Sequence, residues 1–111
     1  MFSFLRRLGP PQIDVTELDS LLKQGAVRVL DVREVSEFKG GHVPGAVNVP
    51  VKRLGERKGV LKRDKPYAVI CASGSRSRGA VNFLLDEGFE GAVSVGGGTN
   101  AWARSGRPVV R

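Results

Sequence analysis

The chain has 111 residues, enough for one domain that buries a substantial core without covalent cross-links. Its single cysteine excludes an internal disulfide framework, and one cysteine with one histidine cannot form a four-ligand zinc site of the usual kind. A reducing cytoplasm is the expected compartment. The formal net charge of +7 favours small anions as ligands. We do not expect nucleic acid to bind, since the few aromatic residues are not interleaved with a basic stripe.

Residues 1–11 combine phenylalanines and leucines with two arginines and end on Gly9-Pro10-Pro11. No apolar run here is long enough for a signal-peptide core or a transmembrane helix. We therefore expect a tail over 1–11 and a domain over 12–111. Two interpretations of the tail stay open: a frayed terminus, or a short amphipathic turn that touches a membrane surface or a partner.

From residue 12 onward, short apolar strands alternate with helices. A brief strand at Ile13 is followed by a helix to Gln24, which starts with a capping box of Asp14 and Glu17 and is ended by Gly25. The apolar strand over 27–32 is typical of burial on both faces. The later elements are a short helix over 33–38, a turn over 42–45, a strand over 46–50, a basic linker of helix and loop over 51–61, an apolar strand ending on Cys71, a helix over 77–87, a strand over 92–95, and a short helix capped by Thr99 and continuing to Ala103. This order predicts a parallel sheet with helices on both faces and ligands at the carboxyl ends of the strands.

The cysteine stands where an apolar strand meets a loop of small residues. Residues 72–75 carry little bulk and Gly74 relaxes the backbone, so successive amide groups can converge on the sulfur as an anion nest. The following helix adds the positive end of its dipole, and Arg76 and Arg78 add full charges. These surroundings favour a thiolate, so Cys71 is predicted to be a nucleophile near neutral pH. The alternative is an inert core cysteine, which would not need such a loop.

Three separated parts of the sequence resemble one known family: residues 31–33 with 37–38 and 41–50, residues 71–77, and Gly96-Gly97 leading to Trp102. Together they resemble the single-domain rhodaneses, from Ile13 to about Pro108. The resemblance implies a three-layer α/β/α sandwich with a five-stranded parallel sheet. It also implies transfer of sulfane sulfur from a donor such as thiosulfate to cyanide or a thiol, through a persulfide on Cys71. We expect no cofactor and no metal.

The loop and its neighbours then receive expected roles. The predicted substrate-binding residues are Ala72, Ser73, Gly74, Ser75, Arg76, Ser77 and Arg78, and the predicted structural support of the site is Asp31, Arg33, Glu37 and His42. For Arg76, two roles stay open: attracting a dianion, or pairing with a carboxylate such as Glu37 to hold the loop. Asp31 and Arg33 fit an ion pair or a cap, and His42 fits a hydrogen-bonded turn. Trp102 fits the core or the pocket rim.

Two other functions stay open. Phosphatases of the same fold, and arsenate reductases, have a loop one residue longer than the four residues between Cys71 and Arg76, because it must hold a tetrahedral oxyanion. A sulfur-carrier or regulatory module would instead pass the persulfide sulfur to a protein, such as a thioredoxin-like or sulfur-relay partner. The loop sequence does not identify that acceptor.

Overall fold

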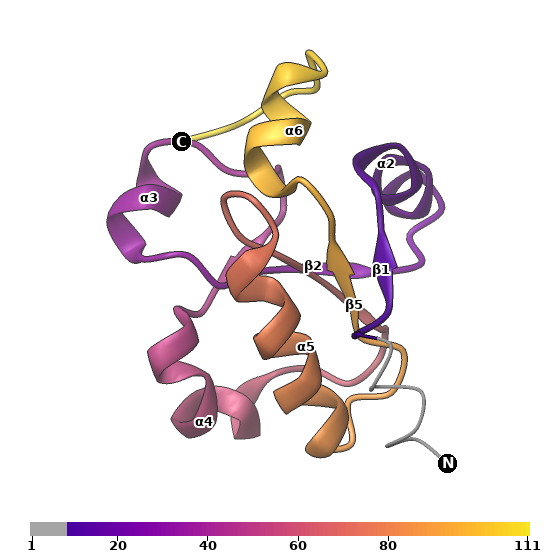
Figure 1. Ribbon diagram of the computed structural model, residues 1–111, viewed down its shortest axis with the longest axis vertical. Coiled ribbons are helices and arrows are strands. Elements are labelled where there is room, and N and C mark those ends of the chain that lie inside the picture. Colours follow the sequence, from indigo (N-terminus) through magenta and orange to yellow (C-terminus); the bar gives the residue numbers. More distant parts are fainter. Residues whose placement is uncertain (1–8) are drawn as a thin grey trace.

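A five-stranded parallel sheet forms the middle layer of the fold (Figure 1). The structure is a computed structural model that describes residues 9–111. The strands are β1 (Gln12–Ile13), β2 (Arg28–Asp31), β3 (Val47–Asn48), β4 (Tyr67–Ile70) and β5 (Val93–Val95). They lie side by side in the order β1-β5-β4-β2-β3, and every pairing is parallel. The central strand β4 is buried throughout, as its apolar sequence predicted.

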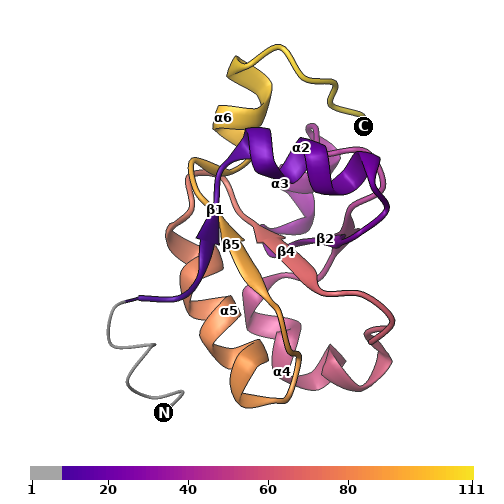
Figure 2. The ribbon, with the colours of Figure 1, turned by 90° about the vertical axis from the view of Figure 1, so that its right-hand side faces the viewer.

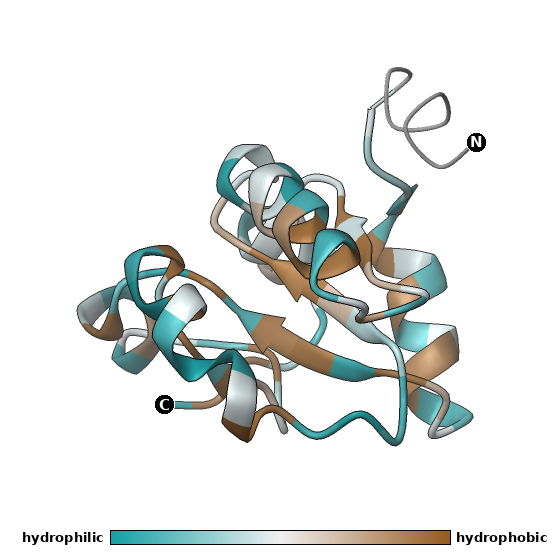
Figure 3. Cartoon of the chain, turned by 90° about the horizontal axis from the view of Figure 1, so that it is seen from below, coloured by the Kyte–Doolittle hydropathy of each residue, from teal (hydrophilic) through white to brown (hydrophobic). Residues whose placement is uncertain are grey.

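Helices cover both faces of the sheet, so the predicted α/β/α sandwich is confirmed (Figure 2). The helices are α2 (Val15–Lys23), α3 (Val35–Lys39), α4 (Leu54–Arg57), α5 (Ser75–Asp86) and α6 (Gly98–Arg104), with 3-10 turns η1 (Val51–Arg53) and η2 (Lys58–Val60). On one face, Leu18 of α2 and Trp102 of α6 pack in one core cluster with Ile70 of β4. On the other face, α4 and α5 pack in a second cluster. Figure 3 shows hydrophobic residues along the strands between these layers.

Helix boundaries follow local sequence signals, with two corrections. The capping box of Asp14 and Glu17 is present, with the Glu17 amide donating to Asp14 over 2.8 Å. Helix α5 begins two residues earlier than the sequence predicted, because Gly74 takes a left-handed φ of 106° and turns the chain directly into the helix. The prediction that Thr99 caps α6 is wrong: the cap position is Gly97, with φ 78° and no side-chain cap, and Thr99 lies inside the first turn.

Among residues 9–111, no helix is long and apolar enough to cross a bilayer. Of the predicted tail over 1–11, residues 1–8 lie outside the described residues, so its two interpretations stay predictions. The division of the chain at residue 11 stays a prediction.

Candidate active site

Cys71 directly follows β4, at the carboxyl end of the central strand where the sequence predicted a ligand site. The side chain is fully buried, and residues 72–74 connect it to the start of α5. The amide of Gly74 donates to the Cys71 sulfur over 3.0 Å and the amide of Ser77 over 3.4 Å. The hydroxyl oxygen of Ser77 lies 3.5 Å from the same sulfur. Donors from the loop and the first turn of α5 therefore converge on one atom.

These contacts decide the ionisation of the thiol. Burial raises the pKa of Cys71, but the hydrogen bonds from the Ser77 hydroxyl and from the amides of Ser77, Gly74 and Ser73 together outweigh it. The pKa therefore lies below its ordinary value. The N-terminus of α5 points at the sulfur and acts in the same direction. The sequence predicted a nest of amides from residues 72–76 and included Ser77 among the substrate-binding residues. In the structure, Ser77 contacts the sulfur through its amide as well as its hydroxyl.

The first turn of α6 holds the outer side of the loop. The amide of Thr99 donates to the Cys71 carbonyl over 2.9 Å, and the amide of Asn100 donates to the Ala72 carbonyl over 3.0 Å. Gly98 makes this approach possible, because a Cβ there would lie 2.3 Å from the Cys71 carbonyl oxygen and 2.6 Å from that of Ala72. With these two carbonyls bound by α6, the loop can present its amides to the sulfur. Sequence reasoning missed this role, although the three consecutive glycines 96–98 were its signal.

Arg76 pairs with Glu37 in a bidentate ion pair that joins the loop end of α5 to α3. The two N–O distances are 2.8 and 3.0 Å. Glu37 also accepts from the amide of Glu34 over 3.0 Å, in a capping box at the start of α3. The Arg76 guanidinium, more than any other group, lowers the pKa of Glu37 from 4.5 to about 2. Of the two roles open to Arg76, the structure displays the pairing role.

Asp31 and Arg33 form a buried ion pair at the end of β2. The Arg33 Nη2 donates to Asp31 over 2.9 Å and to the carbonyl of Gly41 over 2.8 Å. The side-chain amide of Asn48 donates to the main-chain carbonyls of Asp31 and Arg33. This network joins β2, β3 and the loop after α3, and it includes the ion pair that the sequence predicted. The predicted support of the Cys71 site by this pair stays a prediction.

His42 and Trp102 occupy structural positions as well. The Nδ1–H of His42 donates to the Phe38 carbonyl over 2.8 Å, and the two rings stack with centroids 3.6 Å apart. Trp102 is buried in the core, and its indole N–H donates to the Pro108 carbonyl. Arg78 lies elsewhere: its guanidinium is beside Gly9, just before β1. Its predicted part in substrate capture stays a prediction.

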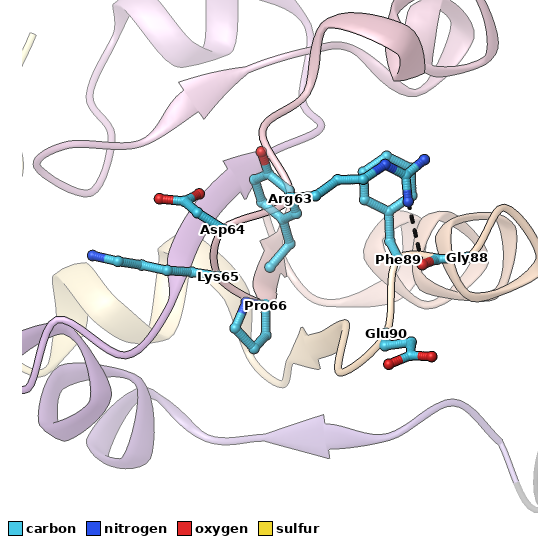
Figure 4. A pocket seen from close by; sticks show the side chains of 8 residues that line it. Arg63, Asp64, Lys65, Pro66, Gly88, Phe89 and Glu90 are labelled. Carbon is cyan, nitrogen blue, oxygen red and sulfur yellow. Dashed lines mark hydrogen bonds between the residues drawn. The ribbon is translucent and has the colours of Figure 1, made fainter.

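A cavity of about 250 Å³ lies at the other end of β4, around Tyr67 (Figure 4). Two of its charged residues, Asp64 and Arg63, already interact with other groups of the fold. Asp64 accepts both hydrogen bonds of a bidentate pair with Arg28, at 2.8 Å each. The guanidinium of Arg63 stacks on the Phe89 ring, 3.7 Å from its centroid, and donates to the Gly88 carbonyl. This cavity is separated from Cys71 by the length of the strand and is not part of the thiol site.

Comparisons with known proteins agree with this geometry. The rhodanese-like domain family matches residues 14–105. The thiosulfate sulfurtransferase GlpE of Shewanella oneidensis is 31% identical over 90 residues, which are 81% of this chain and 89% of that protein. A rhodanese-related protein of Thermoplasma volcanium is 42% identical with a TM-score of 0.82, covering 90% of this chain and 97% of its own.

A further solved structure comes from Rhodopseudomonas palustris and is described as a possible tyrosine phosphatase. It is 26% identical with a TM-score of 0.83, over 91% of this chain and 85% of that one. The fold thus recurs in proteins to which different chemistries are ascribed, and the family match covers most of this sequence. The resemblance seen in the sequence is confirmed, and the chain belongs to the rhodanese-like domain family.

Proposed function

We propose that the protein is a sulfurtransferase that moves sulfane sulfur from thiosulfate, or a similar donor, to a thiol or cyanide through a persulfide on Cys71. The observation that carries the proposal is the set of groups converging on the sulfur: two amides that donate over 3.0 and 3.4 Å, and the Ser77 hydroxyl at 3.5 Å, which can donate once the thiol is ionised. Such a preorganised set stabilises negative charge on sulfur at little reorganisation cost. The similarity to a thiosulfate sulfurtransferase supports the same reaction class.

The proposed reaction has two displacement steps. The Cys71 thiolate attacks the outer sulfur of thiosulfate, a new S–S bond forms, and sulfite leaves with the electron pair of the broken bond. The persulfide then carries its negative charge on the terminal sulfur, beside the loop amides. In the second step, cyanide or a thiolate attacks that terminal sulfur, and the Cys71 thiolate leaves. Neither step requires a proton to be removed from Cys71 once it is ionised, so His42 can keep its hydrogen bond to Phe38.

The carrier function differs from this proposal only in the acceptor. Cys71 is fully buried, so an acceptor must meet the terminal sulfur through the loop rather than approach the cysteine itself. Ser73, Ser75 and Arg76 are the exposed side chains there. A protein acceptor would contact these residues, whereas a small thiol or cyanide needs only the opening between them.

A phosphatase function has less support. Four residues lie between Cys71 and Arg76, one fewer than in the phosphatase loops of this fold. In addition, both oxygens of Glu37 accept from the Arg76 guanidinium, so this side chain is already engaged. Oxyanion-ester hydrolysis would need that guanidinium for the substrate.

Mass spectrometry of the intact protein tests the proposal. After treatment with thiosulfate, the wild type should gain about 32 Da, one sulfur atom, while Cys71→Ser should gain none. The isolated loaded form should then lose its sulfur at a rate that grows with added cyanide, dithiothreitol or thioredoxin, because the chain has no second cysteine to receive it.

Three results would contradict the proposal: no added mass on the wild type, the same added mass on Cys71→Ser, or hydrolysis of an aryl phosphate in a protein that does not load sulfur. Fast discharge to thioredoxin with negligible discharge to small acceptors would instead select the carrier function. Ping-pong kinetics should accompany turnover, since the persulfide is a covalent intermediate.

A further inference from the structure

Ser94 is a fully buried polar residue in the middle of β5. It pairs in register with Val69 of β4, and Cys71 follows two residues later on the same face of the sheet. Both side chains therefore face α5, and the buried side chain of Ser77 on that helix contacts both of them. The Ser94 and Ser77 hydroxyl oxygens lie 2.7 Å apart, a short hydrogen bond in which either group can donate.

The Ser77 hydroxyl has one proton and three polar neighbours. These are the Cys71 sulfur at 3.5 Å, the Gly74 carbonyl oxygen at 3.1 Å and the Ser94 hydroxyl at 2.7 Å. A carbonyl oxygen can only accept, and a thiolate can only accept. When Cys71 is ionised, Ser94 is therefore the one of these neighbours that can donate to the Ser77 oxygen.

The direction of the hydrogen bonds must change with the state of the sulfur. In the thiol form, the Cys71 S–H donates to Ser77, whose own proton can point to Gly74 or Ser94. In the thiolate form, the Ser77 proton turns to the sulfur, and the Ser77 oxygen loses the donor it had. A donor from Ser94 replaces it, so the buried Ser77 oxygen still accepts a hydrogen bond.

We propose that Ser94 is a positioning residue for the nucleophile: its hydroxyl donates to Ser77, and this hydrogen bond directs the Ser77 proton to the Cys71 thiolate. Ser94 acts through Ser77 and does not contact the reacting atoms. This role of Ser94 belongs to the proposed function. It rests on that function in one respect, because it requires a thiolate at Cys71. The exchange moves hydroxyl and thiol protons within the Cys71–Ser77–Ser94 chain, and the proton lost on ionisation goes to solvent.

Other charged groups around Cys71 stay in place in the variants that test this. Arg76 of α5 interacts electrostatically with the sulfur, Glu37 of α3 pairs with Arg76, and the buried pair Asp31–Arg33 lies at the end of the neighbouring strand β2. None of them is a partner of the Ser94 hydroxyl.

The test is the pKa of Cys71, read from thiolate absorbance near 240 nm in the full chain, with Cys71→Ser as background. Because the chain has one cysteine, the signal belongs to one group. Ser94→Ala should raise this pKa by about 0.4 to 1, a roughly 2- to 10-fold weaker ionisation, which is the effect of one hydrogen bond. Ser77→Ala should raise it at least as much. Ser20→Ala, on the exposed surface of α2, is the matched control and should leave it unchanged.

A double variant separates positioning from general packing. Once Ser77 is alanine, Ser94 has no route to the sulfur, so adding Ser94→Ala should produce no further rise in the pKa. If the two shifts add, or if Ser94→Ala alone leaves the pKa unchanged or lowers it, the proposal is overturned. Should Ser94→Ala fail to fold, Ser94→Thr and Ser94→Val provide an isosteric pair, in which the threonine variant should keep the lower pKa.

This measurement needs no sulfur donor. If Ser94 shifts the pKa as expected while thiosulfate adds no sulfur, the positioning role stands and the proposed sulfurtransferase function fails. If sulfur loads normally and the pKa shifts of the two variants add, the proposed sulfurtransferase function stands and the positioning role of Ser94 fails. As a second readout, the acid limb of the pH profile of kcat/KM for thiosulfate should move up in Ser94→Ala by the same amount as the thiolate pKa.

Discussion

Replacing Glu37 with glutamine isolates the charge of the ion pair that joins α3 to the start of α5, beside the loop that follows Cys71. Glutamine has nearly the same shape and keeps an oxygen that can accept from the Glu34 amide, which now donates to Glu37 over 3.0 Å. What is lost is the negative charge opposite the Arg76 guanidinium. Glu37→Gln should therefore destabilise the fold at neutral pH without removing the start of α3.

The magnitude follows from the pKa of Glu37 and from the exposure of the pair. A pKa lowered from 4.5 to about 2 corresponds at face value to about 3 kcal/mol of folding free energy. However, the Arg76 and Glu37 side chains are 39% and 35% exposed, so solvent screens their attraction. Exposed pairs contribute less than about 1 kcal/mol, and bidentate geometry places this one near the upper end. We expect a loss of about 1 kcal/mol.

The same pair predicts a pH dependence with a definite sign. The folded-state pKa of Glu37 is lower than its unfolded value, so the stabilisation is fully present above the unfolded pKa of about 4.5 and is lost as the pH falls toward about 2. Urea unfolding of the wild type and Glu37→Gln should show the full difference at pH 7 and a clearly smaller one at pH 3. Glu56→Gln, at the more exposed Arg53–Glu56 pair, is the control and should have a smaller effect at pH 7. A difference that stays constant from pH 7 to pH 3 would refute this reasoning.

Two further predictions concern the loop clamp and the basic surface. Gly98→Ala places a Cβ against the Cys71 and Ala72 carbonyls at a φ of 58°, so it should cost about 1–3 kcal/mol and abolish sulfur loading. The control Gly79→Ala, inside α5 with open space around its Cβ, should instead be stabilising by about 0.5–1 kcal/mol, and thermal unfolding measures both. Arg78→Ala should raise the KM for thiosulfate about twofold at low ionic strength and have no effect near 1 M salt, where the screening length is about 3 Å. An equal KM at every salt concentration would show that this charge does not attract the substrate.

The sequence was sufficient to predict the layers of the fold and the position of Cys71 in the sheet. Apolar strands alternating with helices specify a parallel sheet, and Cys71 falls at the carboxyl end of its central strand. The small residues after it predicted converging amides, which the Gly74 and Ser77 contacts display. These features depend on residues that are adjacent in the chain, so they can be predicted from the local sequence pattern.

The contacts that hold the loop from outside could not be predicted in the same way. Thr99 and Asn100 contact the loop through main-chain amides. Every residue except proline has such a donor, so the sequence does not show which residues use it. In the sequence, Ser94 is an ordinary polar residue of a strand. Its contact with Ser77 follows only from the register between β4 and β5. Both depend on the relation between segments more than fifteen residues apart, which packing decides.

Backbone and side chains therefore have different tasks in this loop. The sulfur is held by amides of the loop and α5, and the loop carbonyls are held by amides of α6, so side-chain identity at Ala72, Ser73 and Ser75 is not needed to form the nest. Ser73 and Ser75 are exposed, and Ala72 is partly so. Substitutions at these three positions should leave the Cys71 pKa nearly unchanged and alter the choice of acceptor. Substitution of Ser77 should instead change the Cys71 pKa, because its side chain is buried and contacts the sulfur directly.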